Sequence, residues 1–173
     1  MNIILIGFKS CGKSTVGALL AASCGRDFMD TDTEVERLFE AKQGKRLSCR
    51  AIYTRLGEDF LRDLETEVLT GPAAGTSDTI IAAGGGIVLR KENIPLLHKA
   101  GLCVFLDVAL PLLEERLARQ ALSPLFQKKG IAGLYRERHP FYLAAANICH
   151  PITERAGPEE IVRQLCKRLF ADQ

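Results

Sequence analysis

The sequence predicts an α/β protein with three layers, in which a parallel sheet of about five strands lies between helices. Apolar runs of strand length alternate with helical patterns along the whole chain. The first run, residues 3–6, is apolar at every position, which is typical of a strand buried on both faces. No repeat, low-complexity tract or interdomain linker breaks the alternation. We therefore expect residues 1–173 to form a single domain.

Each expected strand is a short apolar run. The first strand ends at Gly7, the second ends at Asp30, and the third runs into three glycines at 84–86. In an open parallel sheet, ligands bind beyond the carboxyl ends of the strands, so we expect the chemistry to lie among these three segments. The expected strands cover residues 3–6, 28–29, 79–83, 102–108 and 147–152.

The expected helices carry apolar side chains on one face, and several end at a glycine. Ser48 is a candidate cap for the third helix, which Gly57 ends. Residues 120–133 are polar and irregular, and we expect them to form a mobile lid. The expected helices cover residues 13–24, 34–42, 49–56, 58–70, 91–100, 111–119, 134–146 and 159–170.

The composition is that of an ordinary globular protein, with 47% hydrophobic and 25% charged residues. A formal net charge of +2 is too small to indicate binding to nucleic acid or to an acidic membrane. No apolar run approaches the roughly 18 residues of a membrane span, and the apolar start does not resemble a signal peptide. The six cysteines are scattered without the spacing of zinc ligands. We expect reduced thiols in a cytoplasmic monomer.

The segment GFKSCGKST, residues 7–15, matches the pattern G-x-x-x-x-G-K-[ST] without a mismatch. Its glycines let backbone N–H groups point at phosphate oxygens, its lysine supplies a cation, and the next hydroxyl is a magnesium ligand. The alternative is a glycine turn with an incidental lysine. A chance match in such a chain is on the order of one in a hundred, so we favour nucleotide binding. The expected ATP contacts in the loop are Ser10, Cys11, Gly12, Lys13, Ser14 and Thr15.

Candidate residues for the phosphate acceptor come from other segments. Asp30 and Asp32 are one residue apart, so on an extended chain their side chains point the same way. One could hold magnesium through water and the other could accept a hydroxyl proton; a simple helix cap at Asp32 is the alternative. Three glycines at 84–86 allow a ligand to approach the backbone, whereas a plain turn needs only one. The pattern alone does not separate Arg62 and Arg138 from solvated helical arginines.

Taken together, these segments resemble the shikimate kinases, which have the nucleoside monophosphate kinase-like P-loop fold. The matching segments occur in the family order over nearly the whole chain: GFKSCGKST at 7–15, DTD at 30–32, GEDFLRDLE at 57–65, AAGGGIV at 82–88 and RHPFY at 138–142. The resemblance implies transfer of the ATP γ-phosphate to the 3-hydroxyl of shikimate, in the pathway to chorismate and the aromatic amino acids. It also implies ATP as co-substrate and one Mg²⁺ per site.

The resemblance also implies roles for individual residues. Ser14 would bind Mg²⁺ and Asp30 would hold it through water, while Lys13 and Asp32 would be catalytic, with Asp32 as the candidate base. The shikimate-binding region would span residues 31–65. Residues that would contact the substrate, position a contact or flank the adenine are Asp32, Arg62, Glu65, Gly84, Gly85, Gly86, Arg138, Arg116 and Arg155.

Two features depart from the family pattern. The lid sequence Arg-Pro-Leu is replaced by Ser-Pro-Leu at 123–125, and residues 42–50 form a longer segment than usual. Loss of an arginine that contacts the transferring phosphate can cost several powers of ten in rate. Arg119, Lys128 or Lys129 could substitute for it, or the enzyme could be slow or inactive. A gluconate-type kinase and a catalytically weak nucleotide-binding protein therefore stay open as alternatives.

Cys11 adds a separate hypothesis about the loop. Its thiol is expected beside the phosphate site, where Lys13 and the helix N-terminus favour the thiolate. We therefore expect a thiol reagent to inactivate the protein and ATP to protect it.

Overall fold

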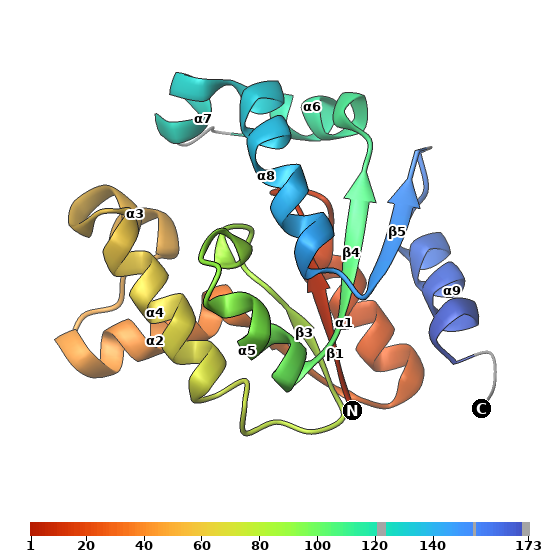
Figure 1. The fold of residues 1–173 in the computed structure, drawn as a ribbon, viewed down its shortest axis with the longest axis horizontal. Coiled ribbons are helices and arrows are strands. Elements are labelled where there is room, and N and C mark those ends of the chain that lie inside the picture. The colour runs from red at the N-terminus through yellow and green to blue at the C-terminus, as the bar shows by residue number, and fades with distance from the viewer. Residues whose placement is uncertain (121–123, 154, 171–173) are drawn as a thin grey trace.

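A parallel sheet forms the centre of the computed structural model, which describes residues 1–120, 124–153 and 155–170 (Figure 1). The strand order is β2-β3-β1-β4-β5, and every neighbouring pair is parallel. Parallel neighbours require crossover connections, which helices provide here. The strands are β1 (Asn2–Ile6), β2 (Asp27–Asp30), β3 (Thr79–Ala82), β4 (Gly101–Val108) and β5 (Ile148–Ile152).

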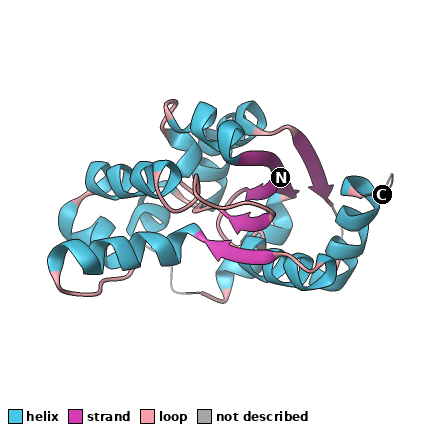
Figure 2. Ribbon diagram, turned by 90° about the horizontal axis from the view of Figure 1, so that it is seen from below, coloured by secondary structure: helices cyan, strands magenta, loops and turns pink. Residues whose placement is uncertain are grey.

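Helices cover both faces of this sheet (Figure 2), which confirms the expected three-layer P-loop fold. Helices α1 and α9 pack against each other, while α5 and α8 both contact β4. No helix in the described residues is long and apolar enough to cross a membrane. The helices are α1 (Lys13–Cys24), α2 (Thr31–Gln43), α3 (Cys49–Leu56), α4 (Glu58–Thr70), η1 (Ile87–Leu89, a 3₁₀ turn), α5 (Asn93–Ala100), α6 (Leu110–Ala118), α7 (Pro124–Lys129), α8 (Ile131–Ala145) and α9 (Pro158–Leu169).

Two apolar clusters position the helices around the site. The larger one surrounds the central strands, and all four isoleucine and leucine side chains of residues 3–6 are buried there, as their continuous apolar run predicts. The smaller cluster holds α2, α3 and α4 together beside the β2 edge of the sheet. It is formed by Val35, Phe39, Ile52, Leu61, Leu64 and Val68.

The second helix begins earlier than the sequence pattern indicates. Helix α2 starts at Thr31 instead of residue 34, because the Asp30 carboxylate accepts a hydrogen bond from the Asp32 N–H at 3.0 Å and caps the helix. Asp32 therefore lies in the first helical turn, and the expectation that both carboxylates point the same way along an extended chain was wrong. The capping role proposed as an alternative for Asp32 belongs to Asp30.

The segment expected to be irregular, 120–133, contains α7 and the start of α8. The expectation was wrong for its described part because Phe126 has a buried partner. Its ring packs edge-on against Phe8 of the phosphate loop, with 5.6 Å between ring centroids, and is 5% exposed. Residues 121–123, which include the altered lid position Ser123, lie outside the described residues. The remaining elements begin and end within a few residues of their expected bounds.

Candidate active site

The phosphate loop joins β1 to α1 with a backbone that only a few residue types adopt easily. Gly7 and Gly12 have φ values of 149° and 103°, and Ser10, a non-glycine residue, has φ of 63°. Such strain in a folded loop is often associated with a functional site. Gly12 precedes α1 without a side-chain cap, so the first N–H groups of the helix are available to an anion.

Lys13 lies across this loop. Its Nζ donates hydrogen bonds to the carbonyl oxygens of Gly7 at 2.9 Å and Phe8 at 3.0 Å. Cys11 Sγ is 3.6 Å from the same Nζ, but Cys11 is 0% exposed and packs beneath the loop. A reagent in solution cannot reach this thiol while the loop is folded, so the expectation of a reactive cysteine facing the phosphate was wrong. Only the backbone of Cys11 can contribute to an ATP site.

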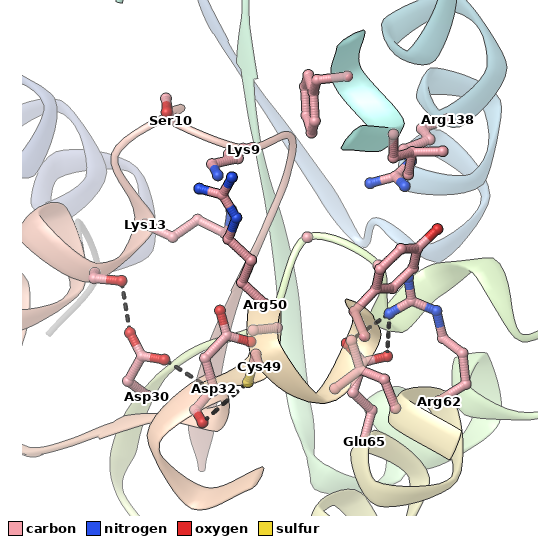
Figure 3. Close-up of a pocket in the computed structure, with 18 of the residues that line it drawn as sticks. Lys9, Ser10, Lys13, Asp30, Asp32, Cys49, Arg50, Arg62, Glu65 and Arg138 are labelled. Carbon is pink, nitrogen blue, oxygen red and sulfur yellow. Dashed lines mark hydrogen bonds and ion pairs between the residues drawn. The ribbon is translucent and has the colours of Figure 1, made fainter. Parts of the chain in front are cut away.

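A cavity of about 480 Å³ lies at the carboxyl ends of the strands (Figure 3). It brings together the phosphate loop, the two aspartates that follow β2, the glycines that follow β3, and arginines from α4 and α8. Of the residues predicted from sequence, those that line it are Ser10, Gly12, Lys13, Ser14, Thr15, Asp30, Asp32, Arg62, Glu65, Gly85, Gly86 and Arg138.

Ser14 and Asp30 form an oxygen-rich corner of this cavity. Ser14 Oγ donates a hydrogen bond to Asp30 Oδ2 at 2.6 Å. In the described part of the chain, no group of three or more His, Cys, Asp and Glu side chains could hold a metal ion by itself. Mg²⁺ usually keeps several waters and binds one or two protein oxygens together with phosphate oxygens. The hydroxyl and carboxylate here fit that kind of site.

Asp32 lies beside Asp30 in a setting that favours its protonated form. Burial among surrounding protein atoms raises the pKa of Asp32, the Asp30 carboxylate raises it further, and Lys13 opposes both effects. The surface that Asp32 keeps exposed lines the cavity. A Cβ atom on Gly84 would lie 2.5 Å from Asp32 Oδ1, so the glycine makes room for this carboxylate. Asp32 is therefore a better proton acceptor than an ordinary aspartate.

Arg62 is a buried cation that two carboxylates orient. It is 6% exposed, and its guanidinium donates to Glu65 at 2.6 Å and to Glu58 at 3.1 Å. Burial lowers the pKa of Arg62, but Glu65 and Glu58 outweigh this effect and raise it, so the guanidinium stays charged. A Cβ atom on Gly86 would overlap the Arg62 guanidinium, so the glycine leaves room for it. Sequence reasoning expected Glu65 to orient Arg62, and the structure pairs them.

Arg138 is a second buried cation, on α8, and it has a different environment. It is 6% exposed and bonds to the hydroxyl of Tyr142, which in turn donates to the carbonyl oxygen of Gly85. Among the described residues, no carboxylate forms an ion pair with Arg138, and its Nε has no hydrogen-bond partner. A buried charge without a directly paired carboxylate is unfavourable, so this end of the cavity favours an anionic ligand.

The comparisons with known proteins agree with this geometry. A family model described as shikimate kinase matches residues 9–170. The chain belongs to the shikimate kinase family. A shikimate kinase from Synechococcus sp. strain JA-3-3Ab is 39% identical over 180 residues, covering 99% of this chain and 90% of its own. A structure of shikimate kinase from Acinetobacter baumannii in complex with shikimate is 28% identical and covers 99% of this chain and 94% of its own, with a TM-score of 0.85.

Membership of the shikimate kinase family makes the protein an ATP-dependent phosphotransferase, as the phosphate loop predicts. The gluconate-type alternative has weaker structural support. A gluconokinase from Sinorhizobium meliloti 1021 is 18% identical, covers 99% of this chain and 97% of its own, and has a TM-score of 0.54. A likeness at this level shows a shared fold alone.

The two arginines expected to flank the adenine in this family occupy different places. Arg116 Nη1 lies 3.3 Å from the carbonyl oxygens of Ser10 and Cys11, and it lines a second hollow beside the phosphate loop. Arg155 does not line this hollow, but it pairs at 2.9 Å with Glu115, which does. The structure therefore joins Arg116 to the loop directly and Arg155 only through Glu115.

None of the three cations suggested as substitutes for the lid arginine lines the main cavity. Arg119 lines the second hollow, where it pairs with Glu115 at 3.5 Å, and Lys129 pairs with Glu137 at 2.6 Å. Lys128 is exposed.

Sequence reasoning missed several cavity residues that the shikimate kinase resemblance does not single out. Lys9 lies in a variable position of the phosphate loop, with its Nζ 5.7 Å from the Phe126 ring centroid. Cys49, Arg50 and Tyr53 come from α3. The spacing of Arg50 and Tyr53, three residues apart, is a signal that they share one face of a helix. The sequence gives no direct sign of which face turns toward the loop.

Proposed function

We propose that the protein transfers the γ-phosphate of ATP to the 3-hydroxyl of shikimate, giving shikimate 3-phosphate and ADP in the pathway to chorismate and the aromatic amino acids. The observation that carries this proposal is the buried Arg138, which lacks a carboxylate partner in the described residues and lines the same cavity as the phosphate loop. Shikimate has one carboxylate. Arg138 and Arg62 offer charge-assisted hydrogen bonds that match it.

The cavity then has two functional ends. The loop end, with Lys13 and the N-terminus of α1, holds the ATP phosphates. The arginine end holds the shikimate carboxylate, with the N–H groups of Gly85 and its neighbours supporting the ring. Asp32 lies between the two ends and faces the acceptor hydroxyl. This arrangement brings donor and acceptor together, which supplies much of the catalysis in phosphoryl transfer.

The transfer step follows from these positions. The 3-hydroxyl oxygen forms a bond to the γ-phosphorus, the bond from that phosphorus to the β–γ bridging oxygen breaks, and ADP leaves. The hydroxyl proton passes to Asp32, whose raised pKa suits it to accept a proton. Ser14 and Asp30 would hold Mg²⁺, which neutralises phosphate charge when bound. Lys13 stabilises the charge on the β- and γ-phosphate oxygens.

We propose that Arg116 and Arg155 flank the adenine of bound ATP and that residues 120–133 form the lid. Leu125 and Phe126, in the described part of the lid, already line the cavity. Closure of this segment over bound ATP would exclude water and limit hydrolysis.

A cytoplasmic monomer is the proposed working form, and the whole chain is proposed to act as one domain. In the described residues, the large apolar side chains that are exposed lie apart in the sequence and in different elements. Isolated exposed apolar residues are normal for a protein without a large partner interface. They are Met1, Phe28, Leu56 and Leu143.

A coupled assay of ADP release tests the proposed substrate. With ATP and Mg²⁺, we expect turnover of at least about 1 s⁻¹ when shikimate is present and little without it. Gluconate at the same concentration serves as the control acceptor. Turnover that depends on gluconate would assign the gluconate-type reaction instead. Nucleotide binding without turnover on either acceptor would favour the weak nucleotide-binding protein.

A further inference from the structure

Arg50 is a cation in the main cavity that the family resemblance does not explain. It lies in the first turn of α3 and lines the cavity together with Lys9, Lys13 and Asp32. Figure 3 shows its side chain extending from α3 toward the phosphate loop, on the side where Lys9 and Lys13 lie and away from Arg62 and Arg138. Arg50 therefore belongs to the loop end of the cavity.

The first turn of α3 is fixed against α2, beside Asp32. Ser48 Oγ accepts the Ala51 N–H at 3.2 Å and caps the helix. The Cys49 N–H donates to Glu36 Oε1 at 3.2 Å, and Cys49 Sγ donates to the backbone oxygen of Asp32 at 3.4 Å. The Arg50 backbone is therefore held next to the segment that carries Asp32, so its side chain starts from a defined position.

The other cations that line this end of the cavity are the lysines Lys9 and Lys13. Lys13 donates to loop carbonyl oxygens, and Lys9 lies over the Phe126 ring. Neither side chain has the planar fork of a guanidinium, which can donate two parallel hydrogen bonds to two oxygens of one phosphoryl group. In phosphoryl transfer, charge is spread over the three equatorial oxygens of the group in transit, so such a fork has a specific target.

We propose that Arg50 is a further catalytic residue, which contacts the terminal phosphoryl group of bound ATP and stabilises it during transfer. The inference rests on the proposed function, because it requires a γ-phosphate to pass from the loop toward Asp32. It also gives α3 a role in phosphoryl transfer, because this helix carries Arg50. Arg119, Lys128 and Lys129, the candidate substitutes for the lid arginine, do not line this cavity.

The test compares Arg50→Ala and Arg50→Lys with the control Arg55→Ala, an exposed arginine on α3 outside the cavity. We expect Arg50→Ala to lower kcat by about 10²–10³-fold, which is the usual effect of removing one hydrogen-bond donor to an oxygen that gains charge in the transition state. The KM for shikimate should be nearly unchanged. Arg50→Lys should recover only part of the rate, because an ammonium cannot form the paired contact. Arg55→Ala should match the unmodified protein.

A second measurement does not depend on shikimate turnover. Calorimetry with Mg²⁺ should show that Arg50→Ala weakens binding of a non-hydrolysable ATP analogue by about tenfold, equivalent to one hydrogen bond to a charged group, and leaves ADP binding unchanged. If the unmodified protein shows no shikimate-dependent turnover, the proposed function fails, and this measurement still decides the role of Arg50. The inference is overturned if Arg50→Ala keeps its kcat, raises only the KM for shikimate, or weakens binding of ADP and the analogue equally.

Discussion

Asp32→Asn is expected to lower kcat by about 10²–10⁴-fold, which is the usual contribution of a general base. The amide has nearly the same shape as the carboxylate but cannot accept the hydroxyl proton. The cap of α2 is retained, because it uses the Asp30 carboxylate and the backbone N–H of residue 32. Steady-state kinetics of the purified variant would measure the loss. Asp27→Asn, an exposed change on β2 outside the cavity, is the matched control and should leave kcat unchanged.

The same substitution is expected to stabilise the protein at neutral pH. Burial and Asp30 raise the pKa of Asp32 in the folded state above its value in the unfolded chain. The folded state therefore binds this proton more tightly than the unfolded chain does. Proton binding stabilises the fold at a pH below the unfolded pKa, and this stabilisation is lost as pH rises through the folded pKa. At pH 7 the ionised carboxylate destabilises the fold, and asparagine removes that effect.

Thermal unfolding at several pH values tests whether Asp32→Asn stabilises the protein as expected. The midpoint of Asp32→Asn should exceed that of the unmodified protein at pH 7, and the difference should shrink as pH falls below the folded pKa of Asp32. The acid limb of the kcat profile of the unmodified protein should lie above the usual range of aspartate. A variant that retains its rate, or one that is less stable at pH 7, would refute the role of Asp32 as a general base with a raised pKa.

Arg62→Met is expected to reduce the free energy of unfolding by about 3–5 kcal/mol, because it leaves Glu65 as a buried charge without its main partner. The side chains of Arg62 and Glu65 are 8% and 4% exposed. The KM for shikimate should rise by about 30-fold or more, the cost of removing one partner from a buried charge pair. Chemical denaturation and steady-state kinetics measure the two effects separately.

A double variant separates stability from binding. Arg62→Met with Glu65→Leu removes both buried charges, and such replacements are often neutral or stabilising. We expect it to recover most of the lost stability while the KM for shikimate stays high. Arg90→Met, which breaks a partly exposed pair with Asp63, is the control and should cost about 1 kcal/mol or less. Recovery of the shikimate KM in the double variant would show that Arg62 does not bind the substrate.

Local motifs made the phosphate loop predictable. The apolar run before it, its glycines and the lysine and hydroxyl that follow depend only on neighbouring residues, and the structure places them at the carboxyl end of β1. The three glycines after β3 could also be recognised in the sequence, but the sequence did not show why glycine is needed there. Two of them make room for the Asp32 carboxylate and the Arg62 guanidinium, which come from distant helices.

Other features depended on tertiary packing and could not be read from the sequence. Cys11 is buried because the loop folds over it, and α7 forms because Phe126 packs on Phe8. The start of α2 depended on which aspartate caps it. Arg50 looks like any helical arginine until the anchoring of α3 on α2 directs it into the cavity.

The most direct measurement is identification of the phosphorylated product. The protein is incubated with ATP, Mg²⁺ and shikimate, and the product is examined by phosphorus and proton nuclear magnetic resonance. We predict one phosphate ester per ADP formed, with phosphorus coupled to the proton at C3 of the shikimate ring. ADP formed with free phosphate only, or a phosphate on another hydroxyl, would contradict the placement of the acceptor between Asp32 and the two arginines.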